Sequence, residues 1–126
     1  MILDSSAIVA ILRDEPERPA FSSAIDTAAT TLISAATVLE SSIVIGRTRH
    51  EDLDDLLSDG DVVVVPFDVD HARLAREAYV RFGKRSGSPA QLNFGDCMAY
   101  ALAKATGEPL LFKGDDFTHT DVTPAR

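Results

Sequence analysis

Four short apolar runs, each separated from the next by stretches with helical periodicity, are the feature that most constrains how this 126-residue chain can fold. The runs lie at residues 1–4, 30–34, 62–66 and 109–112. Strands that alternate with helices are typical of a parallel sheet, because a parallel pair needs a long crossover connection that is usually a helix. The sequence therefore predicts an α/β fold with a mostly parallel central sheet flanked by helices.

The composition fits one globular domain that spans residues 1–126. A chain of this length buries roughly two thirds of the surface that its unfolded form exposes, so neither a disulfide nor a structural metal is needed for stability. No apolar run approaches the roughly 20 residues of a membrane span, and the amino terminus lacks the charged-then-apolar pattern of a secretion signal. We therefore expect a cytoplasmic protein that does not enter a membrane.

Capping residues and apolar periodicity predict where the helices begin and end. Ser34, Asp68 and Asn93 are residue types that cap helix starts, and Gly107 is typical of a helix end. The expected helices span residues 5–12, 21–28, 35–47, 51–58, 68–82 and 93–107.

The apolar pattern of the second half of the chain predicts how its elements are placed. Val62–Val65 is a run of β-branched residues, which is typical of an interior strand buried on both faces. A short last strand is expected at residues 120–122. In the helix after Asp68, the predicted inner face consists of the residues that recur at helical spacing, Val69, Ala72, Ala75, Tyr79 and Phe82.

One basic stretch stands out from an otherwise acidic chain. The formal net charge is −8, which argues against a protein that binds nucleic acid through bulk charge alone. Residues 70–93 nevertheless have a local excess of basic side chains. These side chains either form a solvated helix face and loop or guide a polyanion, and they are Arg73, Arg76, Arg81, Lys84 and Arg85.

Four acidic residues occupy positions that suggest a shared site. Asp4 and Asp116 follow apolar strands, and the carboxyl ends of parallel strands meet at one edge of a sheet, where ligands bind. Asp96 lies in a first helical turn, and Glu40 lies in the middle of an apolar helical stripe. Each has a structural explanation as a cap or turn residue, except that a buried Glu40 needs a partner.

Taken together, the four acids predict a metal site. Carboxylates that converge in one cleft repel each other and raise one another's pKa unless a divalent cation compensates them. A set of oxygen ligands without Cys or His favours Mg²⁺ or Mn²⁺ over zinc. Such a site could activate water and neutralise charge during hydrolysis of a phosphodiester.

The remaining reactive residues do not suggest a competing site. Cys97 is the single cysteine and lies on an apolar helix face, so we interpret it as a core thiol. His50, His71 and His119 are isolated in the sequence. No glycine-rich phosphate loop, zinc-protease motif or nucleophile elbow is present.

Four stretches resemble a known family. LDSSAIVAIL, SAATVLE, LNFGDCMAYALAKATGEPLLFKGDDF and the closing TDV resemble the PIN-domain ribonucleases, specifically the VapC-type toxins of type II toxin-antitoxin systems. The similarity spans nearly the whole chain, and the third stretch is its most specific part. The resemblance implies a single PIN-like nuclease domain over residues 1–126.

The resemblance also implies roles for individual residues. Asp4, Glu40, Asp96 and Asp116 match the acidic quartet of the family, with Asp4 and Asp96 as the direct metal ligands, and Ser6 matches a small hydroxyl residue near the quartet. The family implies an endoribonuclease that depends on Mg²⁺ or Mn²⁺. It also implies a homodimer, an RNA substrate and a cognate antitoxin whose tail enters the active-site groove.

Several alternatives stay open at this point. Asp115 could replace Asp116, although the Asp-Phe pair favours Asp116. The chain could be a catalytically silent PIN scaffold that only binds a partner. A Mg²⁺-dependent phosphoacceptor signalling domain also gathers acids at strand ends, but Pro66 and Phe67 intervene before Asp68 here. RNA choice is expected to depend on the loop at residues 83–91.

Overall fold

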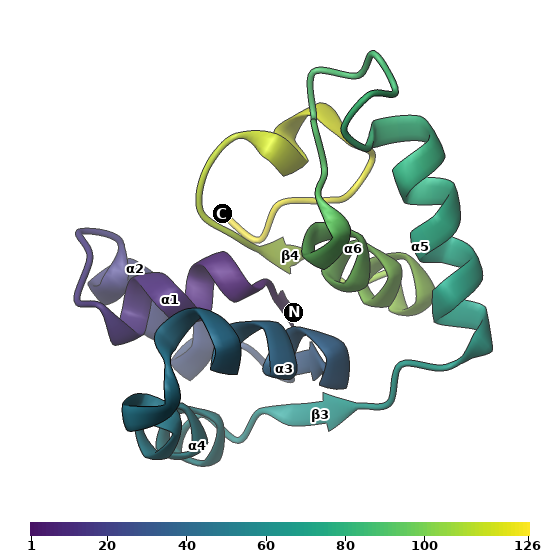
Figure 1. Ribbon diagram of the computed structural model, residues 1–126. Helices are drawn as coiled ribbons and strands as arrows, with labels where there is room; N and C mark the ends of the chain where they lie inside the picture. The colour runs from purple at the N-terminus through teal and green to yellow at the C-terminus, as the bar shows by residue number, and fades with distance from the viewer.

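Four parallel strands form the centre of the computed structural model, which describes all residues 1–126 (Figure 1). The strands are β1 (Ile2–Leu3), β2 (Leu32–Ser34), β3 (Val63–Val65) and β4 (Leu110–Leu111), in the order β3-β2-β1-β4. The chain passes from β1 outward to β3 and then returns to the other side of β1 for β4. The strand order therefore reverses between β1 and β4, where α/β sheets form their ligand crevice.

The helices lie close to their predicted positions. All six predicted helices are present, and 3₁₀ turns join α3 to α4 and follow β4. Their bounds are α1 Ser5–Leu12, α2 Arg18–Thr27, α3 Ala35–Ile45, η1 Arg47–Arg49, α4 His50–Asp59, α5 Val69–Phe82, α6 Phe94–Thr106 and η2 Asp116–His119. The α/β fold with a parallel sheet flanked by helices is thus confirmed.

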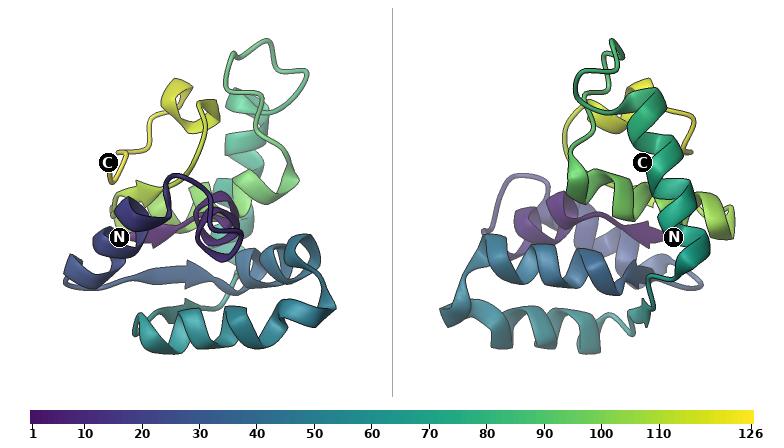
Figure 2. Two further views of the ribbon diagram at one scale, coloured as in Figure 1. Left: turned by 90° about the vertical axis from the view of Figure 1, so that its left-hand side faces the viewer. Right: turned by 45° about the vertical axis from the view of Figure 1, so that its right-hand side comes forward.

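The sheet separates two apolar cores. Ile2 and Leu110 point into the core formed with α5, α6 and the carboxyl-terminal segment. Leu3 and Leu111 point into the core formed with α1, α2 and α4. Successive strand residues face opposite sides of a sheet, and both sides are covered, so even these two-residue strands are fully buried. The views in Figure 2 show the two groups of helices around the strands.

The predicted helix caps are present. The side chains of Asp4, Ser34 and Asp68 each accept a backbone hydrogen bond at the start of α1, α3 and α5. Asn93 and the residue at N3 form a reciprocal capping box at the start of α6. Gly107 ends that helix at a φ of 72°, a left-handed conformation that glycine adopts without a steric penalty.

The prediction that Val62–Val65 forms an interior strand is wrong. β3 lies at the edge of the sheet and pairs with β2 alone, and the side chains of Val63 and Val64 are 52% and 45% exposed. The run of valines identified a strand correctly, because β-branched residues favour extended backbone. It did not indicate the strand's place in the sheet, since that depends on the path of the whole chain.

The predicted inner face of α5 is confirmed at Ala75 and Phe82 and wrong at Val69, Ala72 and Tyr79. His71, Ala75 and Ala78 are buried, whereas Val69 is 67% and Tyr79 is 44% exposed. The buried residues also recur at helical spacing, but the stripe begins with a histidine that an apolar pattern does not count. The two alanines let α5 pack closely along α6, and Figure 1 shows these helices side by side.

The last strand predicted at residues 120–122 is displaced. The Thr120 amide and hydroxyl both donate to the Phe117 carbonyl, so the chain is still turning there. Pairing begins further along, where the Leu110 amide donates to the Thr123 carbonyl at 2.8 Å and Pro124 forms a parallel bridge with Leu110. None of the helices has both the length and the apolar character needed to cross a membrane.

Candidate active site

Asp4 lies at the carboxyl end of β1 and is almost fully buried. Its amide donates to the Leu111 carbonyl of β4 at 3.0 Å, which fixes it at the point where the strand order reverses. One carboxylate oxygen, Oδ2, accepts the Ser6 amide at 2.9 Å and the Ser6 hydroxyl at 2.6 Å. The other oxygen, Oδ1, is buried and has no hydrogen-bond partner. Asp4 therefore caps α1 with one oxygen and leaves the second available to a ligand.

Ser6 joins the ends of the two neighbouring strands. Its hydroxyl donates to Asp4 and accepts the Lys113 amide, just after β4, at 2.9 Å. The Lys113 ammonium binds Glu15 at 2.6 Å and Glu17 at 3.2 Å, which holds the α1–α2 connection against the same segment. Because the Ser6 oxygen already accepts one hydrogen bond, its own proton is directed to Asp4.

Asp96 and Glu40 approach this edge from two helices. The Asp96 Oδ2 atom accepts the Asn93 amide at 2.9 Å in the capping box of α6. The Glu40 Oε1 atom is buried without a hydrogen-bond partner. The rest of the Glu40 carboxylate lies against the Gly95 Cα, so closely that a Cβ there would overlap it. Glu40 of α3 is thus held directly beside the residue that precedes Asp96.

Electrostatic coupling brings all four predicted acids into one cluster. The pKa of Asp4 is raised to about 7, chiefly by burial; the hydrogen bonds from Ser6 oppose this shift, and the charges of Asp96 and Glu40 contribute less to it. The pKa of Asp96 is raised to about 6, again chiefly by burial; the Asn93 hydrogen bond opposes the shift, the charges of Asp116 and Glu40 add to it, and Lys84 lowers it. Asp116, rather than its neighbour in the sequence, is the acid of η2 that acts on Asp96.

The cluster fits a divalent cation in its chemistry but is not a closed metal cage. No group of three His, Cys, Asp or Glu side chains is arranged to hold an ion. Two carboxylate oxygens, Asp4 Oδ1 and Glu40 Oε1, are nevertheless buried without partners. Unpaired buried carboxylates are costly, and oxygen atoms of this kind are the ligands that Mg²⁺ and Mn²⁺ prefer. The donor set therefore suits a hard cation that keeps several of its water ligands.

Comparison with known proteins places this arrangement in a family. The model of the PIN domain matches residues 1–122. Ribonuclease VapC28 of Mycobacterium tuberculosis is 50% identical, and the alignment covers 99% of this chain and 97% of that protein. Ribonuclease VapC42 from the same species is 44% identical, with 99% and 98% covered. The chain belongs to the VapC group of the PIN-domain family.

Solved structures agree on the PIN fold. The crystal structure of M. tuberculosis VapC20, described as a toxin that cleaves the sarcin-ricin loop, has a TM-score of 0.74 at 16% identity and covers 98% of both chains. A toxin-antitoxin complex from Klebsiella pneumoniae has a TM-score of 0.72 at 14% identity, covering 95% of this chain and 92% of that one. The resemblance inferred from the four sequence stretches is thus confirmed.

The interpretation of Cys97 in this PIN domain is also confirmed. Its side chain is buried in the core beside α5, and burial raises the pKa of the thiol to about 11, far from the range of a reactive cysteine. His71 was interpreted as isolated but is buried, with a ring nitrogen that has no partner and a ring that packs against Phe67. Nothing in the structure connects it to the acids.

Gly95 and Lys113 contribute to the site although neither was predicted from the sequence. Gly95 could have been noticed, because a glycine in the first turn of a helix costs stability and usually has a packing reason. Lys113 contributes through its backbone amide, which the residue type does not reveal. The two residues position Glu40 and Ser6, so they support the acids without joining them.

Replacing Gly95 with Ala should destabilise the PIN domain by about 1–3 kcal/mol, because the new methyl group overlaps the Glu40 carboxylate. In a Glu40→Ala background the same change should become neutral or stabilising by about 0.5–1 kcal/mol, the usual gain from glycine to alanine in a helix. Urea unfolding of the wild type, the two single variants and the double variant measures both changes in the free energy of unfolding. An equal effect in the two backgrounds would contradict the contact.

The pKa of Asp4 predicts a pH-dependent stability for the metal-free protein. A carboxyl group with an ordinary pKa of 3.8 when unfolded and about 7 when folded binds more protons in the folded state between these pH values. The free energy of unfolding should therefore fall as the pH rises from about 4 to 7. Because each pKa unit corresponds to about 1.36 kcal/mol, Asp4 accounts for about 4 kcal/mol of that fall.

Asp4→Asn tests this origin, since an amide oxygen can still cap α1 but does not ionise. The variant should lose most of the difference in unfolding free energy between pH 5 and pH 7.5, measured by urea unfolding after chelation. A slope as steep as that of the wild-type chain would show that Asp4 does not cause it.

Proposed function

We propose that this chain is a Mg²⁺- or Mn²⁺-dependent endoribonuclease that hydrolyses RNA phosphodiester bonds, and that it is the toxin of a toxin-antitoxin pair. The observation that supports this most is the cluster of four carboxylates at the strand-order reversal, with two buried oxygens that have no partner in the protein. The relatives at 44–50% identity are named ribonucleases, which agrees with the chemistry of the cluster.

The proposed role of each acid follows from the contacts that hold its side chain. Asp4 and Asp96 are the proposed metal ligands, because each has one oxygen fixed by a backbone amide and a second oxygen without that constraint. Glu40 and Asp116 complete the metal's surroundings or orient the attacking water. A bound divalent ion would lower the pKa of water and neutralise charge on the phosphate. Ser6 keeps Asp4 oriented by directing its proton to Oδ2.

An apolar groove beside Glu40 is the proposed contact for protein partners. Leu39 and Ile43 of α3 are 63% and 72% exposed, and with Phe94 and Met98 of α6 they border a cavity of about 440 Å³. Exposed apolar surface of this kind marks protein interaction sites. We assign it to the cognate antitoxin, whose insertion would also block Glu40, and we expect the chain to form a homodimer. The structural relative from K. pneumoniae was solved as a toxin-antitoxin complex.

The acidic charge of the chain is compatible with an RNA substrate. The formal charge of −8 disfavours binding through bulk charge, but a metal-centred cleft with basic residues at its rim attracts the phosphate backbone locally. The acidic surface elsewhere would favour a basic antitoxin segment. The expected location is the cytoplasm, where such a substrate is available.

Cleavage of labelled total RNA by chelator-washed, antitoxin-free protein tests the function. We expect cutting with Mg²⁺ or Mn²⁺, none after chelation, and a loss of about 100-fold or more for Asp96→Asn, because a lost metal ligand costs several kcal/mol of barrier. If wild-type protein is folded and binds the metal but does not cut any RNA, the catalytically silent scaffold becomes the better description.

Two adjacent acids, Asp115 just before η2 and Asp116 at its start, supply a matched pair of variants. Asp116→Asn should lower the cleavage rate at least tenfold, whereas Asp115→Asn should leave it within a few-fold, because only Asp116 acts electrostatically on Asp96. Single-turnover rates with excess enzyme measure both effects. A larger loss of cleavage rate for Asp115→Asn than for Asp116→Asn would assign the fourth acid of the site to Asp115.

A further inference from the structure

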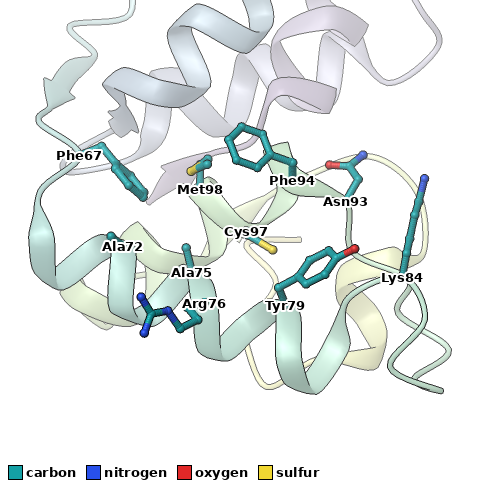
Figure 3. Close-up of a pocket in the computed structure, with 10 residues that line it drawn as sticks. All are labelled: Phe67, Ala72, Ala75, Arg76, Tyr79, Lys84, Asn93, Phe94, Cys97 and Met98. Atoms are coloured by element: carbon teal, nitrogen blue, oxygen red, sulfur yellow. The ribbon is translucent and has the colours of Figure 1, made fainter.

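A second, larger cavity opens between α5 and α6, next to the acids. Its volume is about 600 Å³, within the range of small-molecule sites. Figure 3 shows that its two ends differ in character. Phe67 and Met98 lie toward one end, with the Arg76 guanidinium on the same side, and the Tyr79 hydroxyl, the Asn93 amide and the Lys84 ammonium lie toward the other.

The polar end of this cavity is fixed beside the catalytic cluster. The Lys84 amide donates to the Leu92 carbonyl at 3.0 Å, and the Leu92 amide donates to the Phe82 carbonyl at 2.9 Å. This pairing of the two sides of the loop holds Lys84 beside Asn93, the cap of α6. The Lys84 charge is close enough to Asp96 to act on it. A phosphate at the acids would therefore lie within the field of Lys84.

Lys84 is also free to bind a ligand, unlike two other cations of the basic stretch. Arg73 is paired with Asp70 at 2.9 Å, and Arg81 is paired with Asp121 at 3.4 Å. Lys84 has no ion pair within the protein. Arg76, which lines the same cavity, and Arg85 likewise have no ion pair within the protein. The basic stretch is thus partly a paired, solvated helix face, and two of its unpaired cations, Arg76 and Lys84, border the cavity.

Exposed aromatic rings border the same cavity. Phe94 is 79% exposed, and Tyr79 is 44% exposed. Both rings adjoin the cavity between α5 and α6, and Phe94 also separates it from the groove beside Glu40. Accessible aromatic faces next to a free cation are the combination that single-stranded nucleic acid binds, by stacking of bases and contact with phosphates.

We propose that this cavity binds one unpaired nucleobase of the RNA, directly next to the phosphate placed at the acids. The base stacks on Phe94 or Tyr79, and Lys84 contacts the adjoining phosphate. This inference rests on the proposed endoribonuclease function and adds the form of its substrate, a strand with an unpaired base beside the cleaved bond. An apolar protein segment would not use the cation and amide at the polar end, whereas a nucleotide uses both ends.

Binding of short RNA to the chelated, non-cleaving protein tests the subsite. The probes are a fluorescein-labelled hexamer of mixed RNA sequence and a hexamer with the same ribose-phosphate backbone that lacks bases, measured by fluorescence anisotropy. We expect the base-containing hexamer to bind at least tenfold more tightly. Phe94→Leu and Tyr79→Leu should bring that ratio toward one, because they keep apolar volume but remove the stacking face.

Two further variants separate charge from stacking. Lys84→Gln should weaken binding of both probes by a similar factor and leave their ratio unchanged, since phosphate contact does not depend on the base. Arg73→Gln is the control for charge because its guanidinium is already paired with Asp70, and Val80→Ala is the control for exposed apolar surface on α5. Both controls should leave the affinity for each probe, and therefore also the ratio, unchanged.

Three results would overturn the subsite. The first is that the two probes bind equally, and the second is that neither probe binds. The third is that Phe94→Leu and Tyr79→Leu weaken binding only where light scattering shows that they also dissociate a dimer. In that case a second copy of the chain occupies the cavity. If the protein cleaves total RNA but binds the two hexamers equally, the base subsite is wrong and the proposed nuclease function stands. If the protein binds the base-containing hexamer more tightly but does not cleave total RNA, the subsite is supported and the proposed nuclease function is wrong.

Discussion

Burial of carboxylates at one edge of the sheet is the constraint on which the rest of this structure depends. Burial raises the pKa values of Asp4 and Asp96, and the charges of Glu40 and Asp96 act on Asp4 while those of Glu40 and Asp116 act on Asp96. A fold that keeps such groups together must hold them with contacts that do not neutralise them. Backbone amides, one serine hydroxyl and one glycine surface meet this requirement here.

The acids are part of the scaffold as well as of the site. Asp4 caps α1, and Asp96 completes the capping box of α6. Each uses one oxygen for the helix, and Asp4 Oδ1 has no partner within the protein, so a structural role for these residues is compatible with the proposed metal-binding role. The arrangement also orients the side chains before any ligand arrives, because a capping hydrogen bond fixes the carboxylate plane. Pre-organisation of this kind lowers the cost of binding.

Local features of the sequence predicted much of this structure. Caps at Ser34, Asp68 and Asn93 and the helix end at Gly107 were identified because they depend on a few neighbouring residues. The strand ends that position Asp4 and Asp116 followed from short apolar runs, and the likeness to the PIN family then connected the four acids.

Features that depend on the path of the whole chain were not predictable from local pattern. The valines of β3 show β propensity but not an edge position, and the buried stripe of α5 begins at His71, which has no apolar signature. Contacts between Glu40 and Gly95, or between Lys113 and Ser6, join segments far apart in the sequence. The edge position of β3 has a consequence for self-association. Its outer backbone groups and half-exposed valines form a template to which another extended chain can add, so this edge is exposed to strand-to-strand aggregation wherever nothing covers it.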